Sequence, residues 1–233
     1  MRSPFQVLFA LVLPLLLLRA EAPIRLNRIV GPFASRNESR LAALIRFGRE
    51  NRLCFGIEFS DASFEDIPVI QLPQTTLREA VEAILVRDQG HSLAVSTLKG
   101  VVLIRSKRSH PPDWLDHRLP RFRIPRMQVV WASLNLSMAL ERHLNPSIQG
   151  FAGDYPPGAS ADQVGPLDIR DATIRELLCT VVGASGKADW IATGGLTLGS
   201  GKNASVNRYW TLLYDPDPVL SRPVIRLSLP KIP

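Results

Sequence analysis

The feature that most constrains the fold is a local pattern that occurs twice in the chain. In residues 70–85 (IQLPQTTLREAVEAIL), a short I-x-L segment precedes a Thr-Leu-Arg-Glu sequence and an amphipathic stretch. Residues 167–182 (LDIRDATIRELLCTVV) repeat this order. Apolar residues recur at helical spacing after each motif, which predicts a helix with one buried face. The two copies therefore predict an internal structural repeat.

Each motif also has the spacing of a helix capping box. In Thr76 with Glu79, and in Thr173 with Glu176, each side chain is placed to accept a hydrogen bond from the other residue's backbone N–H. These four residues are predicted to cap helices, and none of them needs a chemical role.

The segments around the two motifs extend the repeat. Before the first motif, an amphipathic helix from about Asn37 and a strand over 53–59 are predicted, and after it the Lys99-Gly100 turn predicts a hairpin. The second half predicts a helix over 134–144, a strand over 147–155 and a hairpin around a Gly-rich turn. The predicted fold class is α+β, with two small helix-on-sheet modules in the order helix-strand-strand-helix-hairpin.

The residue composition along the 233-residue chain also predicts its division into segments. Arg2, an apolar run and Ala20-Glu21-Ala22 are typical of a secretory signal peptide, so we expect an exported protein whose mature part is soluble. The predicted divisions are a signal peptide (1–22), a first module (37–105), a linker (106–120), a second module (121–214) and a Pro-rich tail (215–233).

The first module resembles a known family. The stretch from SRLAALIRFGRENRLCFGIEF through TLREAVEAIL to VVLIRS is similar to the short N-terminal (STN) domain shared by secretins and TonB-dependent receptors, and to the related secretin N-domains. Residues 133–214 match more weakly. The residues that carry the match are Thr76, Leu77, Glu79, Ala80, Ile84, Leu85, Leu103 and Ile104.

The resemblance implies where the protein works and how. Such domains are small α/β units of the bacterial envelope that act by protein–protein contact. In secretins they stack as periplasmic rings, and in transducing receptors they dock a regulator. We therefore expect a periplasmic or cell-envelope protein whose partners are envelope proteins, with outer-membrane secretin or receptor components among the candidates. Self-association and peripheral membrane contact stay open.

A basic run is the main candidate for contact with another molecule. Arg118, Arg121, Arg123 and Arg126 surround Phe122, in a segment where Pro125 favours an edge strand. The arginines either guard that edge or bind an anionic envelope component, a lipid headgroup or a cell-wall polymer. The net charge of +7 agrees with an acidic partner, while export argues against nucleic acid.

Cys54 and Cys179 allow two interpretations. In an exported protein the pair can form a disulfide, but both lie in apolar segments where buried thiols are also common.

The sequence predicts no enzyme, metal or cofactor. His110 and His117 flank two aspartates in HPPDWLDH, but Pro111-Pro112 excludes the helix that would align metal ligands, so the segment is interpreted as a solvated linker. The sequence GGLTLGSGKN lacks the spacing of a phosphate-binding loop and predicts a hairpin turn instead.

Overall fold

The computed structural model describes residues 24–36, 38–59, 66–67, 69–85, 93–106, 113–144, 162–186, 188–198 and 205–214. The predicted signal peptide, the strand expected at 147–155 and the C-terminal tail lie outside these residues.

Three of the four α-helices of the described residues begin at a capping side chain, Ser39, Thr76 or Thr173. The four helices are α1 (Arg40–Glu50), α2 (Leu77–Leu85), α3 (Val129–Leu144) and α4 (Ile174–Ser185), with a short 3-10 helix η1 (Asp113–Asp116). The Ser39 hydroxyl accepts a hydrogen bond from the Ala42 backbone N–H at 3.2 Å, which fixes the start of α1. Gly186, in the left-handed conformation with φ of 66°, ends α4.

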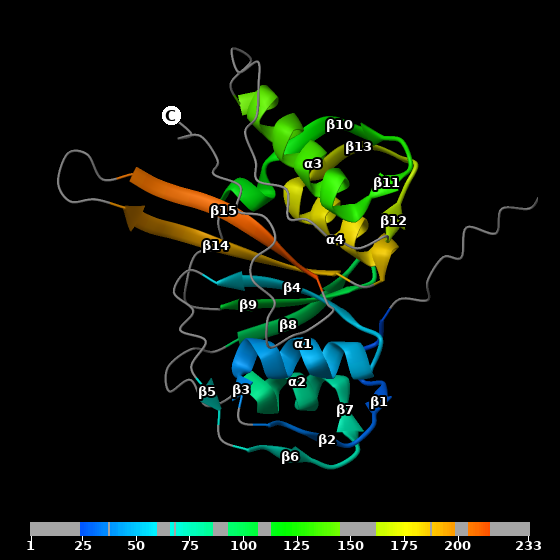
Figure 1. Cartoon of the computed structure of the whole chain (residues 1–233), viewed down its shortest axis with the longest axis vertical. Coiled ribbons are helices and arrows are strands. Elements are labelled where there is room, and N and C mark those ends of the chain that lie inside the picture. The colour runs from blue at the N-terminus through cyan, green and yellow to red at the C-terminus, as the bar shows by residue number, and fades with distance from the viewer. Residues whose placement is uncertain are drawn as a thin grey trace, which may run out of the picture.

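A five-stranded sheet forms the centre of the molecule (Figure 1). Its strands are, in spatial order, β15 (Ser205–Tyr214), β14 (Ala188–Leu198), β4 (Cys54–Phe59), β9 (Val101–Ser106) and β8 (Leu93–Leu98). β4 is parallel to both of its neighbours, whereas β8–β9 and β14–β15 are antiparallel pairs. The two predicted modules thus contribute strands to one sheet.

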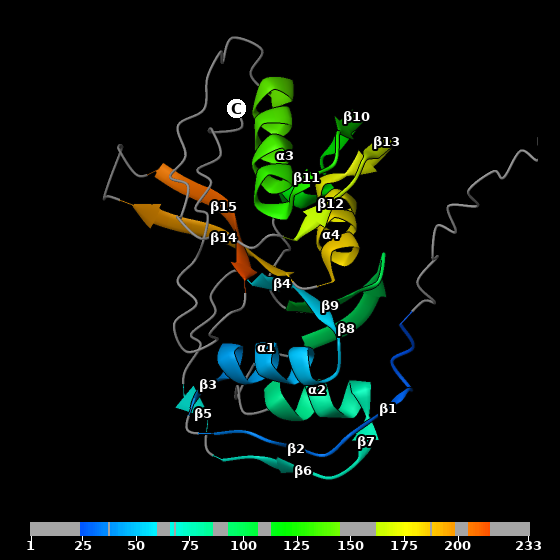
Figure 2. The ribbon, with the colours of Figure 1, turned by 45° about the vertical axis from the view of Figure 1, so that its right-hand side comes forward.

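Two narrow antiparallel ribbons lie farther from this sheet (Figure 2). In the first ribbon, β1 (Ile29–Val30), β2 (Phe33–Ala34) and β3 (Glu38–Ser39) pair with β7 (Thr75–Thr76), β6 (Gln71–Leu72) and β5 (Asp66–Ile67), respectively. In the second ribbon, β10 (Arg118–Ile124) and β11 (Met127–Gln128) pair with β13 (Leu167–Thr173) and β12 (Gln163–Val164).

The two halves of the chain use the same order of elements. Each begins with a ribbon segment and a helix, returns through the other ribbon segment, and ends with a second helix and a hairpin. The first half has β4 as an additional strand after α1, and the described residues of the second half contain no counterpart of it. In each half the helix pair lies between its ribbon and the five-stranded sheet, with a separate apolar core (Figure 1). The architecture is therefore α+β, as predicted.

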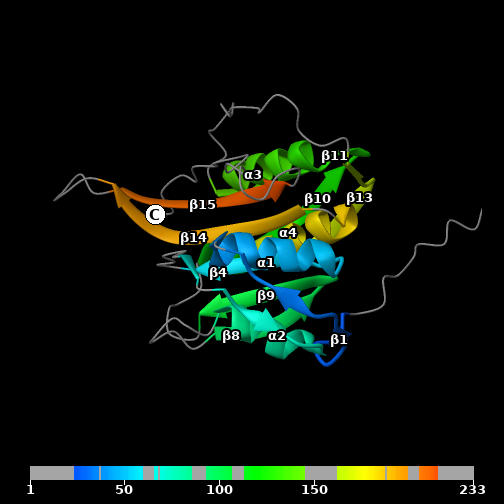
Figure 3. The ribbon, with the colours of Figure 1, turned by 60° about the horizontal axis from the view of Figure 1, so that its bottom comes forward.

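β4 explains why the halves share a sheet. Phe55 and Ile57 belong to the core beside α1 and α2, whereas Cys54 belongs to the core beside α3 and α4. Both faces of β4 are buried, which is typical of a strand with parallel neighbours on either side. Figure 3 shows β14, β4, β9 and β8 side by side.

Both predicted hairpins are confirmed. At the β8–β9 turn, Lys99 and Gly100 have φ angles of 50° and 74°, the pair of positive values that a type I′ turn requires. β14 pairs with β15, but the turn predicted over GGLTLGSGKN begins too early, because residues 194–198 belong to β14. The register shifts between Thr193 and Leu196, where Gly194 and Gly195 lie within the strand.

Some predicted boundaries are wrong. α1 begins at Arg40, three residues after Asn37. The edge strand predicted around Pro125 is interrupted there, because β10 ends at Ile124 and β11 begins at Met127. Val129 and Val130 are buried in the first turn of α3, where the Val129 N–H donates to the Asp162 carbonyl oxygen at 3.1 Å.

The interpretation of residues 113–117 as a solvated segment is also wrong. η1 spans Asp113–Asp116, and its Leu115 is fully buried in the second core. Asp116 forms an ion pair with Arg175 of α4. Because the segment contributes both an apolar and a charged contact, it is part of the fold of the second half.

Replacing Thr173 by alanine is expected to lower the free energy of unfolding by about 1 kcal/mol, the usual cost of losing an N-cap side chain. The Thr173 hydroxyl accepts from the Glu176 N–H at 3.1 Å, and that bond would be lost. Urea unfolding of the two proteins measures the difference. Thr180→Ala is the matched control within α4, and a Thr173→Ala loss no greater than the control's would contradict this role for the cap.

Candidate binding surface

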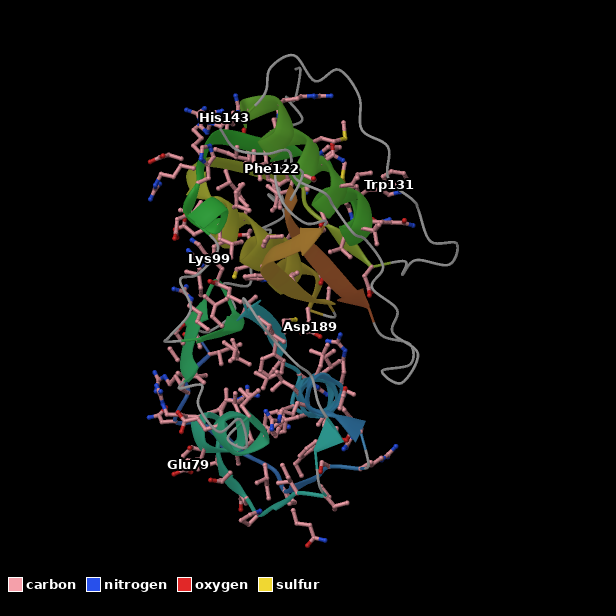
Figure 4. The ribbon with its side chains drawn as sticks, turned by 90° about the vertical axis from the view of Figure 1, so that its left-hand side faces the viewer. Glu79, Lys99, Phe122, Trp131, His143 and Asp189 are labelled. Atoms are coloured by element: carbon pink, nitrogen blue, oxygen red, sulfur yellow. The ribbon has the colours of Figure 1, made fainter. Side chains whose placement is uncertain are left out.

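The second ribbon separates an apolar face from a charged one. On β10, Leu119, Phe122 and Ile124 are buried against α3 and α4. Figure 4 shows Phe122 inside this half of the molecule. The predicted basic residues lie on the exposed side of β10 and in the turn after it; Arg118, Arg121, Arg123 and Arg126 are all exposed.

β13 adds charges that the linear sequence does not associate with the basic run. The register places Arg170 directly opposite Arg121, and Asp168 directly opposite Arg123. Arg121 donates two hydrogen bonds to the Asp168 carboxylate, at 2.8 and 2.5 Å. Farther along, Arg118 lies 3.2 Å from the Asp171 carboxylate. The structure thus gathers five arginines and two aspartates on one surface, here called the arginine ribbon.

Asp168 is the electrostatic centre of the arginine ribbon. The hydrogen bonds from Arg121 hold the pKa of the Asp168 carboxyl below its ordinary value, and the charges of Arg123 and Arg170 lower this pKa further. Within the described part of the chain, the side chains of Arg123, Arg126 and Arg170 form no hydrogen bond and no ion pair.

A shallow hollow lies at the end of the arginine ribbon. It is lined by Arg123, Ile124, Pro125, Pro166, Leu167 and Asp168. Its lining combines two prolines with two aliphatic residues, and Arg123 and Asp168 supply the charge.

The two predicted capping boxes are present as reciprocal hydrogen bonds. The Thr76 N–H donates to the Glu79 carboxylate at 3.1 Å, and the Glu79 N–H donates to the Thr76 hydroxyl at 3.3 Å. The corresponding distances for Thr173 and Glu176 are 2.8 and 3.1 Å. All four residues serve as helix caps, and none of them contributes to the arginine ribbon.

The disulfide considered for Cys54 and Cys179 is not formed, and both residues are buried thiols. The Cys54 thiol lies 3.9 Å from the Val182 carbonyl oxygen, within hydrogen-bond range for sulfur. Burial raises the pKa of the Cys179 thiol to about 12, so this residue is not a reactive thiolate at neutral pH.

Buried ion pairs join the two halves of the chain, and the sequence patterns did not predict them. Arg175 of α4 donates to both oxygens of Glu58 on β4, at 2.6 and 3.0 Å, and Arg105 lies 3.3 Å from the same carboxylate. The side chain of Glu58 is completely buried. A glutamate in the otherwise apolar segment LCFGIEF was the available signal, because a buried carboxylate needs a cationic partner.

A second pair acts on the other face of the sheet. Arg49 of α1 lies 2.9 Å from Asp189 of β14, whose other oxygen accepts the Phe55 backbone N–H at 2.6 Å. Figure 4 shows Asp189 where the two halves meet. Charged contacts therefore tie both faces of the sheet to the opposite half of the chain.

His117, the last residue of HPPDWLDH, has a ring contact that the sequence did not predict. The rings of His117 and His143, at the end of α3, have centroids 5.0 Å apart. Burial, together with the neighbouring His143, lowers the pKa of His117 from its ordinary value of 6.5. His110 lies outside the described residues. No group of three or more potential metal-ligating side chains occurs among the residues that the structure describes.

Acidification is expected to destabilise the protein through His117. Because its pKa is lower in the folded state, the unfolded chain binds the proton more readily, so the contribution of His117 is complete above pH 6.5 and decreases as pH falls through the folded pKa. His117→Gln should therefore make the melting temperature less dependent on pH below neutrality. A thermal melt series measures this, and an unchanged pH dependence would contradict it.

Comparisons with known proteins give no relative. The chain matches no family model, no curated protein and no solved structure. Within the described ranges, none of the helices has the combination of length and apolarity that a membrane crossing requires.

Proposed function

We propose that this chain is an exported protein of the bacterial cell envelope that acts by binding other proteins. In this proposal, each half is an N-domain-like unit related to those of secretins and TonB-dependent transducing receptors. The observation that carries the proposal is the twofold order of ribbon segment, helix, ribbon segment, helix and hairpin. The signal-like N-terminus supports export.

The packing supports a binding role for the whole double unit. β4 and the ion pairs Glu58–Arg175 and Arg49–Asp189 fasten the halves together, so surfaces of both units are held in a fixed relation. β8 is an edge strand of the five-stranded sheet. Among the described residues, β10 and β13 pair only with each other, so each of them also has an unpaired edge. Unpaired strand edges and a charged ribbon are surfaces on which protein partners dock.

Site-specific photo-crosslinking in the bacterium that encodes the chain tests this function. A photoreactive residue placed at Ser96 of β8 or at Arg123 of the arginine ribbon should give adducts with another envelope protein, recovered from the periplasmic or outer-membrane fraction. The same residue at Glu82, on the exposed side of α2, is the control position. Absence of adducts at both test positions, with the protein retained in the cytoplasm, would contradict the proposal.

A second candidate function is binding of an anionic envelope component, a lipid headgroup or a cell-wall polymer. The exposed Arg123, Arg126 and Arg170, which have no ion pair in the described chain, favour it. Sedimentation with phosphatidylglycerol vesicles and with isolated cell walls tests this candidate. Binding that is lost in Arg121→Gln/Arg123→Gln/Arg126→Gln supports it, and binding that the triple variant retains excludes the basic run.

A further inference from the structure

We propose that the arginine ribbon binds an extended, acidic segment of a partner protein. This inference rests on the proposed function as a protein-binding module, and it names the surface and the chemistry of the partner.

The charge arrangement of the arginine ribbon is unfavourable for the isolated fold. Arg121 and Arg170 lie directly opposite each other, and like charges at such positions destabilise a strand pair. Asp168 compensates the repulsion only in part, because this single carboxylate faces three guanidinium groups. A carboxylate supplied by another molecule would complete the pairing of Arg123 and Arg170.

The spacing of these arginines fits an extended chain. Arg121 and Arg123 are two residues apart on β10, a separation of about 6.6 Å along a strand. An extended peptide has the same repeat, so carboxylates at alternate positions of the peptide face successive arginines. The guanidinium group binds each carboxylate through two parallel N–H donors, as Arg121 already binds Asp168.

The strand edges indicate where such a segment lies. β10 contains Pro120, which has no N–H, whereas the stretch of β13 from Leu167 to Arg170 contains no proline. β13 pairs only with β10 among the described residues, so its other edge offers backbone N–H and carbonyl groups. A segment added at this edge lies directly beside Arg170 and two strand spacings, about 9.6 Å, from β10. Its acidic side chains would therefore extend across β13 toward Arg121 and Arg123, and its end lies near the hollow formed by Arg123 and the two prolines.

The surface fits a peptide better than a membrane. The large exposed hydrophobic side chains of the described residues are Ile29, Val69 and Trp131, and none of them is on β10 or β13. A surface that binds lipid needs apolar anchors besides its charge.

Peptide binding tests the inference directly. The probe is a labelled peptide in which glutamate alternates with threonine, titrated against the purified protein by fluorescence anisotropy. Arg123→Gln/Arg170→Gln should weaken binding by about tenfold, since it removes two exposed charge pairs. Arg25→Gln/Arg142→Gln removes the same charge from exposed positions elsewhere and should change the affinity less than about twofold.

A substitution that removes a negative charge from the arginine ribbon should have the opposite effect on peptide binding. Asp168→Asn removes the competing carboxylate and releases Arg121, so it should strengthen peptide binding several-fold, whereas Glu82→Gln on α2 should not. Melting temperatures check that the ribbon variants are folded. They should stay close to that of the unsubstituted protein, because these side chains are exposed and their loss removes no core contact.

Several outcomes overturn the inference. Equal binding of a peptide with the same composition but all its glutamates in one block shows unspecific charge attraction. Equal effects of the ribbon and control double variants place the site elsewhere. Binding to phosphatidylglycerol vesicles without peptide binding assigns the surface to lipid. Photo-crosslinks from Ser96 that persist in Arg123→Gln/Arg170→Gln, with unchanged peptide affinity, contradict this inference alone and leave the proposed function standing.

Discussion

Replacing Glu58 by glutamine should lower the free energy of unfolding by about 3 kcal/mol, as expected when one partner of a buried ion pair is removed. The substitution keeps the size of the side chain but leaves Arg175, whose side chain is only 6% exposed, without its two hydrogen bonds to a carboxylate. Asp116 remains as a partner of Arg175, which is why the expected loss lies at the lower end for such pairs. Urea unfolding measures the change.

The control for this substitution is Glu50→Gln on α1. Glu50 also pairs with an arginine, Arg46 at 2.9 Å, but its side chain is 47% exposed. An exposed pair of this type contributes less than about 0.5 kcal/mol. If Glu58→Gln and Glu50→Gln had similar effects, the Glu58–Arg175 pair would not be a main connection between the two halves.

Trp190→Ala should lower the free energy of unfolding by about 4 kcal/mol, which is typical for the loss of a large aromatic side chain from a core. Trp190 of β14 is fully buried, and its ring lies over Gly56 of β4, where a Cβ atom would come within 2.6 Å of the indole. The substitution therefore opens a cavity at the place where the halves share the sheet. Equilibrium denaturation followed by far-UV circular dichroism detects the change.

Trp131→Ala on α3 is the matched control, because the Trp131 side chain is 41% exposed. Its expected effect is less than about 1 kcal/mol, because the half-exposed Trp131 side chain buries less apolar area than Trp190 and so less burial is lost. A Trp190→Ala effect as small as that of Trp131→Ala would show that the contact between β14 and β4 contributes little to stability.

The sequence predicted the local features of the fold well. The capping residues Thr173 and Glu176, and the Lys99-Gly100 turn, are local signals whose hydrogen bonds or dihedral angles depend on residues a few positions apart. The helices and the closing hairpin of each half follow from such signals and were predicted. The short ribbon strands β1, β2, β3 and β5 and the segment that contains η1 were not predicted.

The shared sheet was not predicted, because strand neighbours are chosen by contacts between distant residues. Arg78 and Arg175 occupy the same position of the repeat, yet the Arg78 side chain is 50% exposed while that of Arg175 is 6% exposed. The difference arises from Glu58, which lies in the other half of the chain. A repeat motif read by itself contains no information about such a partner.

The candidate surface was predicted in part for the same reason. The arginines of β10 stand out as a run, whereas Asp168 and Arg170 join them only through the register of β10 with β13. Likewise, nothing close in sequence to His117 indicated that His143 would be its neighbour.

The central place of β4 has a consequence for the kinetics of folding. Gly56 and Trp190 pair in the sheet although most of the chain lies between them, and pairings of such high contact order form slowly because a long loop must close first. The first half can form its own hairpin and helices early. Until the second half has folded, however, one edge of β4 has no partner strand. We expect the nascent protein to be most prone to aggregation or to chaperone binding during this stage of folding.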